Sequence, residues 1–329
     1  YAMVLINGES LYAFRDPNGI RPLVLGKLPN DAGWCVASET CAFDILGAEF
    51  VREVEPGEVL RINAEGLVSE RAVAPRKKAL CIFEHVYFAR PDSVMDGATV
   101  QSMRVKMGEQ LARESAVEAD LVIGVPDSGL PGAEGFSRAS GIPCRTGFVK
   151  NRYVGRTFIQ PTQEMRELGV RLKLNPLRET IEGKRVVVVD DSIVRGTTSK
   201  QIVRMLREAG ATEVHMRIVS PEVKWPCFYG IDTDTQDQLI SARKTPEEVC
   251  EWIGADSLAF LSVEGLLSCV PEGGYCCSCF DGAYPVEIPA VFSQGKFLDG
   301  YIPNNLTKAS ANSHRSVSDV AREIEKEYE

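Results

Sequence analysis

The sequence predicts an α/β protein built on a doubly wound, mainly parallel β-sheet. Between about residue 78 and residue 220, short apolar runs alternate with stretches whose apolar residues recur at helical spacing. Residues 184–189, Lys-Arg-Val-Val-Val-Val, contain an unbroken β-branched run, which is typical of a parallel strand covered on both faces. In such a sheet, ligands bind beyond the carboxyl ends of the strands.

The individual elements of this α/β part have their own periods and boundaries. Val100, Met103, Met107 and Leu111 recur at helical spacing, and Gly210 ends the last helix of the series. The expected helices span residues 100–118, 128–139 and 197–209, and the expected strands span residues 119–126, 142–149, 184–189 and 213–219. We therefore divide the chain into three parts, which are residues 1–75, 76–265 and 266–329.

The first 75 residues have a different pattern. Short apolar runs alternate with turn signals, such as Arg-Asp-Pro-Asn-Gly at 15–19 and Glu-Pro-Gly-Glu at 55–58, and a helical pattern occurs only around residues 39–46. This stretch is expected to be mostly β, with too few strands to close a domain alone. Because the chain starts at Tyr1 within a hairpin-like pattern, we interpret it as a fragment or a processed chain.

Composition and charge exclude several classes of protein. Charged residues make up 25% of the 329 residues, and no apolar stretch approaches the roughly 20 residues of a membrane span. The net charge of −9 argues against broad binding to nucleic acid or to anionic membranes. Ten cysteines without a secretory signal indicate reduced thiols or metal ligands rather than disulfides, so we expect a cytoplasmic protein.

The clearest candidate site directly follows the run at 184–189. Asp190 and Asp191 leave this apolar strand and enter a loop that runs into a helix start. Backbone N–H groups at a helix N-terminus bind anions, and hydroxyls and a glycine favour the close approach of a phosphate. In this loop the residues of those types are Ser192, Arg195, Gly196, Thr197 and Thr198. Since two acids would repel a phosphate beside them, we expect them to bind ribose hydroxyls or Mg²⁺.

An ATPase metal strand, in which acids also follow apolar residues, is the main alternative. It requires a phosphate-binding loop that ends in Gly-Lys-Ser or Gly-Lys-Thr. Gly-Lys begins at residues 26, 183 and 295 and is never followed by Ser or Thr, and the sequence has no G-x-G-x-x-G. A turn that carries two solvated acids is the simplest remaining alternative.

Four segments together give a specific resemblance to a known family. They are the loop at 190–198, Cys-Ile-Phe-Glu-His-Val-Tyr-Phe-Ala-Arg-Pro-Asp-Ser at 81–93, Lys-Asn-Arg-Tyr-Val-Gly-Arg-Thr-Phe-Ile-Gln-Pro at 150–161, and Ser-Val-Glu-Gly-Leu at 262–266. The first resembles the phosphoribosyl diphosphate motif of type I phosphoribosyltransferases. The set, taken in its order along the chain, resembles the glutamine phosphoribosylpyrophosphate amidotransferase family up to about residue 289. The resemblance implies a type I phosphoribosyltransferase fold, preceded by the C-terminal part of an N-terminal-nucleophile (Ntn) hydrolase glutaminase domain of αββα architecture.

The resemblance also implies roles for particular residues. Residues 125–129, Val-Pro-Asp-Ser-Gly, match a diphosphate-binding loop, and residues 150–161 match a loop that closes over the donor and excludes water. The implied catalytic residues are Asp190, Asp191, Lys150 and Arg156. Those implied to bind the donor are Ser192, Arg195, Gly196, Thr197, Thr198, Asp127 and Ser128, and those implied to hold Mg²⁺ are Ser128, Asp190 and Asp191. Read alone, the first segment is an ordinary strand-to-helix turn and the second is a solvated basic surface.

The cysteines contain one metal-binding pattern. Cys276 and Cys279 form a C-x-x-C, although Cys277 between them offers a second pairing. The resemblance implies that a [4Fe–4S] cluster is held by Cys81, Cys227, Cys276 and Cys279. A zinc site is the alternative, but we expect the nearby His85 to be a packing residue rather than a ligand. The remaining cysteines are expected to be buried free thiols, and they include Cys35, Cys41, Cys144, Cys250 and Cys269.

By this resemblance, the chain converts phosphoribosyl diphosphate and ammonia to 5-phosphoribosylamine and pyrophosphate in de novo purine synthesis, with Mg²⁺ and a [4Fe–4S] cluster as cofactors. Residues 1–75 resemble the end of the glutaminase domain that releases ammonia from glutamine, on motifs at 15–22 and 37–41. That family's nucleophile lies upstream of Tyr1, so we expect free ammonia to be the substrate here. The resemblance further implies feedback inhibition by purine nucleotides and a homotetramer. Two alternatives are a regulatory module that binds the donor without turnover and an enzyme of the same fold that uses a nucleobase.

Overall fold

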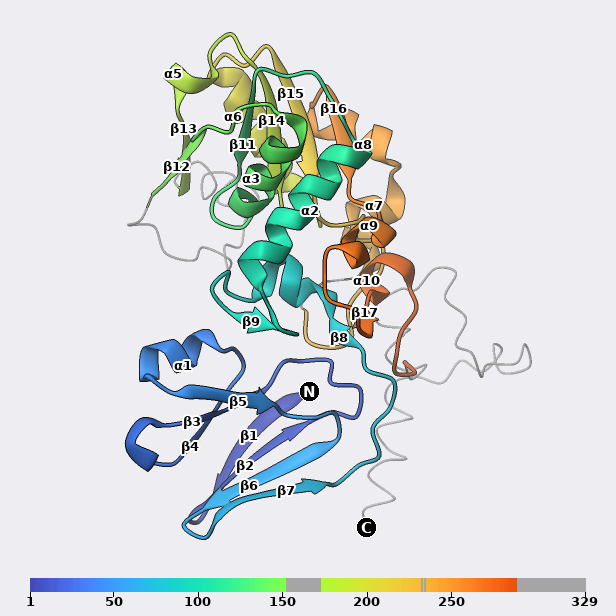
Figure 1. Ribbon diagram of the computed structural model, residues 1–329. Helices are drawn as coiled ribbons and strands as arrows, with labels where there is room; N and C mark the ends of the chain where they lie inside the picture. Colours follow the sequence, from blue (N-terminus) through green and yellow to red (C-terminus); the bar gives the residue numbers. More distant parts are fainter. Residues whose placement is uncertain (152–172, 232, 234, 289–329) are drawn as a thin grey trace, which may run out of the picture.

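The structure is a computed structural model, and it describes residues 1–151, 173–231, 233 and 235–288. An N-terminal part made of antiparallel sheets lies against a larger α/β part (Figure 1). The α/β part contains a parallel sheet with helices beside it, as the sequence predicts. No helix in these described ranges is long and apolar enough to cross a membrane.

The N-terminal part consists of two antiparallel sheets. One has the strand order β1 (Ala2–Asn7), β2 (Ser10–Arg15), β6 (Glu58–Asn63) and β7 (Gly66–Arg71). The other has the order β4 (Trp34–Ala37), β3 (Val24–Lys27) and β5 (Glu49–Glu53), with η1 (Pro29–Asp31) and α1 (Cys41–Leu46) as its helices. These strands have a small core of their own, formed by Ala13, Leu23, Leu25, Val54, Leu60 and Ile62.

The parallel sheet has the strand order β11 (Leu121–Gly124), β14 (Arg185–Asp190), β15 (Glu213–Ile218) and β16 (Ser257–Phe260). Its central strand β14 is covered on both faces, as its β-branched run predicts. Val187 and Val189 pack in one hydrophobic core with α2 (Val100–Glu114) and α3 (Gly129–Ser140). Val186 and Val188 pack in a second core with α6 (Thr197–Glu208).

One expectation for this sheet is wrong, and one of its strands was not predicted. The expected strand at 142–149 contributes to the sheet only a bridge between Cys144 and Val122, because Pro143 lacks the N–H that a ladder needs. The chain then forms β12 (Phe148–Lys150), which pairs antiparallel with β13 (Leu174–Pro176) in a separate hairpin. The strand β16 was not predicted, since its four half-buried residues give no clear alternation.

Short elements connect the two parts and complete the chain. Between them lie β8 (Leu80–Cys81), the π-helix η2 (Glu84–Phe88), β9 (Val94–Met95) and β10 (Ala98–Thr99). The short helix α5 (Arg178–Ile181) directly precedes β14. After β15 lie η3 (Gln236–Gln238), α7 (Ile240–Arg243), α8 (Pro246–Ile253), α9 (Val263–Ser268), β17 (Tyr275–Cys276) and α10 (Ser278–Asp281). The strand β17 pairs in parallel with β8, so a segment near the end of the described residues lies beside the start of the α/β part (Figure 1).

Candidate active site

The two acids of the candidate site lie at the carboxyl end of β14. Both are buried, with 7% of Asp190 and 8% of Asp191 exposed. The hydroxyls of Ser128 and Ser192 donate hydrogen bonds to the Asp191 carboxylate, and the Asp191 backbone N–H donates to Asp190 Oδ1 at 2.9 Å. Ser128 comes from a different loop, so the structure brings two segments expected to share this sheet edge into direct contact.

The electrostatics of this acid pair suit a divalent cation. Burial raises the pKa of Asp190 well above its usual value, and the charge of Asp191 raises it further. Burial also raises the pKa of Asp191, although hydrogen bonds from Ser128 and Ser192 oppose this effect. Mg²⁺ is commonly bound by only one or two carboxylates together with substrate phosphates and water. Two adjacent buried carboxylates with a hydroxyl beside them fit this ion, because it would supply positive charge where burial disfavours negative charge.

The loop after the acids leads into the N-terminus of α6. Gly196 has φ of +76°, and a Cβ there would lie 2.7 Å from Trp252 Cζ3 and 2.8 Å from Ile240 Cδ1. Thr197 begins the helix and is half-buried, whereas Arg195 and Thr198 are exposed. The first turn of a twelve-residue helix therefore opens beside the acid pair, where its N–H groups can bind an anion.

A second loop, between β11 and α3, closes the other side of the site. Its Val125 N–H donates to the carbonyl of Val189 at 2.9 Å, and a Cβ on Gly129 would lie 2.4 Å from the same oxygen. Glycine is thus required for the close approach of α3 to β14. Asp127 is exposed and forms an ion pair with Lys150, which ends β12. Of the implied catalytic residues, Arg156 lies outside the described residues.

The four cysteines predicted to bind a cluster are buried, with 6–9% of each residue exposed. Cys81 and Cys276 are paired residues of β8 and β17, and the Trp225 N–H donates to the Cys279 carbonyl at 3.0 Å, next to the segment of Cys227. Burial, opposed by the charge of Arg21 and supported by the charges of Glu84 and nearby cysteines, raises the pKa of Cys81 to about 12. Burial raises the pKa of Cys279 well above its usual value, and the charges of nearby cysteines act in the same direction.

Within the described residues, no three His, Cys, Asp or Glu side chains converge closely enough to hold one metal ion. A single zinc ion would need such convergence. In a [4Fe–4S] cluster each thiolate binds a different iron, so its ligands need not converge on one point. The donor set here is four buried thiols on segments that contact one another, and such an all-thiolate set fits the cluster better than it fits a single zinc ion.

The remaining cysteines were expected to be buried free thiols, and not all of them are buried. Cys41 and Cys269 are buried and Cys35 and Cys250 are half-buried, but Cys144, which bridges to the edge strand β11, is exposed. Cys277 is as buried as its neighbours. His85 is a packing residue as expected: it is fully buried, its ring lies edge-on to Tyr275 at 5.5 Å, and burial lowers its pKa to about 4.

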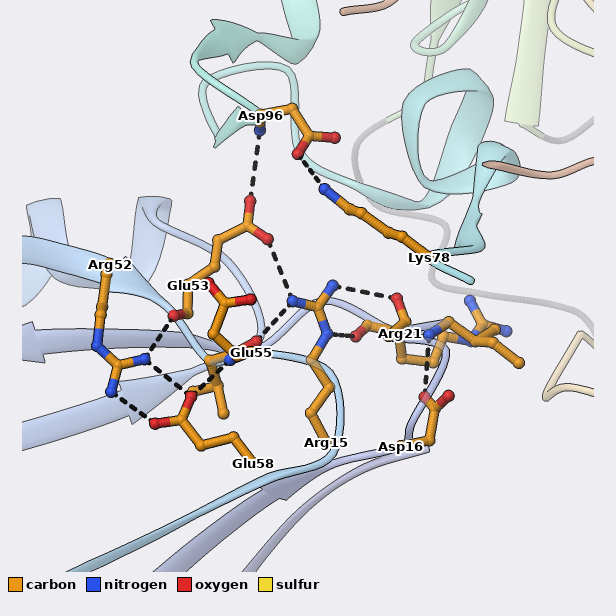
Figure 2. A network of polar contacts seen from close by, with 12 residues as sticks. Arg15, Asp16, Arg21, Arg52, Glu53, Glu55, Glu58, Lys78 and Asp96 are labelled. Atoms are coloured by element: carbon orange, nitrogen blue, oxygen red, sulfur yellow. Dashed lines mark hydrogen bonds and ion pairs between the residues drawn. The ribbon is translucent and has the colours of Figure 1, made fainter. Parts of the chain in front are cut away.

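The polar contacts that join the two parts of the chain were not predicted from the sequence. Figure 2 shows Arg15 with its guanidinium directed at Glu53, and Glu53 in turn accepts from the Asp96 backbone at 3.4 Å. Lys78 and Asp96 form an ion pair at 2.6 Å in the same region. The sequence gives no signal for these pairs, although Arg15 lies in a segment on which the resemblance rests.

Comparison with known proteins identifies the class of the α/β part. Residues 106–220 match the family model described as phosphoribosyl transferase domain. These residues include β11, β14 and β15, the acid pair and the start of α6. Together with the sheet order, this match shows that the region is a phosphoribosyl transferase domain, and the predicted fold class is confirmed.

The comparisons then narrow the similarity to particular proteins. The chain is 57% identical over 301 residues to the amidophosphoribosyltransferase of Synechocystis sp. and 55% identical over 294 residues to that of Bacillus subtilis. These alignments cover 91% and 88% of this chain, and in both cases 61% of the relative. The predicted resemblance is therefore confirmed, and the chain spans about three-fifths of the length of these relatives.

A solved structure agrees with this similarity. The glutamine phosphoribosylpyrophosphate amidotransferase from B. subtilis, complexed with ADP and GMP, matches with a TM-score of 0.80 and 55% identity. The match covers 87% of this chain and 64% of that one. Because it extends well beyond the phosphoribosyl transferase domain, the antiparallel sheets that precede the domain share the likeness.

Proposed function

We propose that this chain carries the phosphoribosyltransferase activity of an amidophosphoribosyltransferase of de novo purine biosynthesis. It would replace the diphosphate of phosphoribosyl diphosphate by ammonia, giving 5-phosphoribosylamine and pyrophosphate. The observation that supports this proposal most directly is the buried pair Asp190 and Asp191, bonded to Ser128 and placed before the N-terminus of α6. The chain's 50–57% identity to amidophosphoribosyltransferases supports ammonia as the acceptor.

Residues of different charge are assigned to different parts of the donor. We assign the 5-phosphate or diphosphate to the N–H groups and hydroxyls at the start of α6 and to the loop of Asp127 and Ser128. Asp190 and Asp191 would hold the ribose hydroxyls and Mg²⁺, which when bound neutralises charge on the leaving diphosphate. Lys150, and Arg156 in the part not described, would add positive charge on the diphosphate side. Catalysis would depend on positioning and charge neutralisation, without a protein nucleophile.

The cofactors and partners follow from the same resemblance. We propose that Cys81, Cys227, Cys276 and Cys279 hold a [4Fe–4S] cluster that joins β8, β17 and the segment around Trp225. In a full-length enzyme, glutamine would supply the ammonia and be converted to glutamate. Purine nucleotides are proposed as feedback inhibitors because a relative was solved with ADP and GMP. We also propose a cytoplasmic homotetramer.

Pyrophosphate release tests the proposed activity. The chain is incubated with phosphoribosyl diphosphate, Mg²⁺ and ammonium, and release is expected only when all three are present. Asp191→Asn should lower the rate at least about 100-fold, whereas Asp44→Asn, a matched change of an exposed acid on α1, should not alter it. Donor binding without turnover would instead indicate a regulatory module. Release that depends on added purine or pyrimidine bases would indicate a nucleobase acceptor.

A further inference from the structure

Residues 84–94, here called the linking segment, are held by the N-terminal part of the chain. Glu39 follows strand β4, and its Oε2 accepts hydrogen bonds from the Arg90 backbone N–H and from Ser93 Oγ, both at 2.7 Å. Ser93 is fully buried, so this contact lies inside the boundary between the two parts. Hydrogen bonds to an ionised carboxylate are stronger than neutral ones, and here a single carboxylate oxygen accepts two of them.

The α/β part holds the same segment from the other side through Arg104 of α2. Its Nε donates to the His85 carbonyl and its Nη2 donates to the Ala89 carbonyl, both at 2.8 Å. Only 4% of Arg104 is exposed. Burying a guanidinium is costly unless its donors are matched, so the two carbonyls are held in place by this charge. Burial lowers the pKa of Arg104, while the negative charges of Asp191 and Glu39 raise it.

Helix α2 continues this connection to the candidate site through backbone contacts with α3. A Cβ on Gly108 would lie 1.9 Å from the Gly132 carbonyl oxygen, and a Cβ on Gly135 would lie 1.9 Å from that of Val105. Helices in backbone contact have no side-chain layer that could absorb a displacement. The residue just before α3 is Ser128, whose hydroxyl donates to Asp191. Close backbone contacts thus connect α2, through α3, to the residues around the acid pair.

We propose that Arg104 is a positioning residue for the donor site. The N-terminal part binds the linking segment through Glu39, and through Arg104 it controls how well the donor site is ordered. The proposal rests on the proposed function in taking phosphoribosyl diphosphate as the donor. The structural basis of this proposal is that Glu39 and Arg104 bind the linking segment from two sides, and that α2 contacts α3 at glycines. Nothing in the proposed chemistry requires Arg104 to touch the donor.

Hydrogen exchange tests the connection without any ligand. Backbone amides of the linking segment and of residues 125–132 are followed in the wild-type chain and in Glu39→Gln, Arg104→Met and Arg104→Lys. We expect exchange in both regions to accelerate about fivefold or more in the first two variants and less in Arg104→Lys, which keeps the charge but not the two-pronged geometry. Arg113→Met, an exposed change on the same helix, should leave both regions unchanged.

Donor affinity is measured next, with phosphoribosyl diphosphate and Mg²⁺ in a calorimeter. Arg104→Met should raise the dissociation constant about tenfold, Arg104→Lys should raise it less, and Glu39→Gln about threefold. Because Glu39 acts through Arg104, the double variant Glu39→Gln/Arg104→Met should bind no more weakly than Arg104→Met alone. Arg113→Met should bind as the wild type does.

The outcomes separate this proposal from the proposed function. Unchanged exchange at residues 125–132 in both Glu39→Gln and Arg104→Lys overturns the positioning role, and so does full additivity in the double variant. If Arg104→Met does not fold, Glu39→Gln and Arg104→Lys still decide the question. If the wild-type chain binds no donor, the proposed function fails while the exchange data still decide whether Arg104 connects the two parts.

Discussion

Arg21 and Glu84 form an ion pair across the boundary between the two parts of the chain, with Nη1 and Oε1 2.7 Å apart. The Arg21 Nε also donates to the Tyr229 carbonyl at 3.1 Å, and its guanidinium lies over the Phe88 ring at 5.4 Å. Only 8% of the Glu84 side chain is exposed. One arginine thus joins the N-terminal part, the π-helix η2 and the segment that follows Cys227.

Breaking this pair should be costly because it leaves a buried acid unpaired. Arg21→Met is expected to lower the free energy of unfolding by about 3 kcal/mol, measured by urea denaturation. The double variant Arg21→Met/Glu84→Leu should regain much of this loss, since no buried charge remains. Arg90→Met, which breaks an exposed pair with Asp92, should cost under about 0.5 kcal/mol. A double variant less stable than Arg21→Met would contradict this account.

The hydrogen bonds of Glu58 predict that the stability of the chain depends on pH. Its carboxylate accepts from Arg52 at 2.6 Å, from Ser69 Oγ at 2.5 Å and from the Glu55 N–H at 2.6 Å. Burial alone would raise the pKa of Glu58, but these bonds outweigh it and lower the pKa from 4.5 to about 2. A depressed folded pKa stabilises the fold above the unfolded value and loses that stability as pH falls through the folded one.

Glu58→Gln should therefore destabilise the chain at pH 7 by about 2 kcal/mol, a value reduced for solvent screening at the half-exposed Arg52. The difference from wild type should shrink as pH falls from 4.5 through about 2, because the wild-type carboxyl becomes protonated over that range. Urea unfolding at several pH values in that range measures this difference in the free energy of unfolding. Glu70→Gln, on the exposed face of the neighbouring strand β7, is the control. A difference that stays constant with pH would exclude an ionic origin.

Gly196 and Gly141 both adopt the left-handed backbone conformation, so they can be compared directly. Both have φ near +75°, but a Cβ on Gly141 would meet nothing within 4 Å, whereas one on Gly196 would meet Trp252 and Ile240. Gly141→Ala should cost only about 1 kcal/mol for the backbone conformation. Gly196→Ala adds a steric conflict, so we expect about 2–4 kcal/mol and a weaker affinity for phosphoribosyl diphosphate. Equal effects of the two substitutions on stability and affinity would show that this packing is unimportant.

Cys276 and Cys277 are adjacent, similarly buried thiols, and only the first belongs to the proposed cluster set. After anaerobic reconstitution with iron and sulfide, the wild-type chain and Cys277→Ser should both contain about four irons and absorb visible light. Cys276→Ser should lose most of the iron and the absorbance. The reverse result would assign the ligand to Cys277. Zinc without sulfide in the purified chain would contradict the cluster altogether.

Much of the α/β part could be predicted because its signals are local. The valine run of β14, the acids after it and the glycine before α6 lie within 13 residues of one another, so sequence spacing fixes their spatial relation. The segment at 142–149 shows the limit of such reasoning. Its apolar residues suit a strand, but Pro143 and the hairpin of β12 with β13 decide which sheet they join.

By itself, the sequence determined the class of the chain and the position of its candidate donor loop, because strand, acids and helix start follow one another directly. Tertiary structure alone decided which distant residues meet at the boundary between the two parts of the chain. Arg21 meets Glu84 across 63 positions and Glu39 meets Ser93 across 54, and such ion pairs and hydrogen bonds carry no periodic signal. Only folding brings these charges together, because their burial is tolerated where a partner from another segment satisfies them.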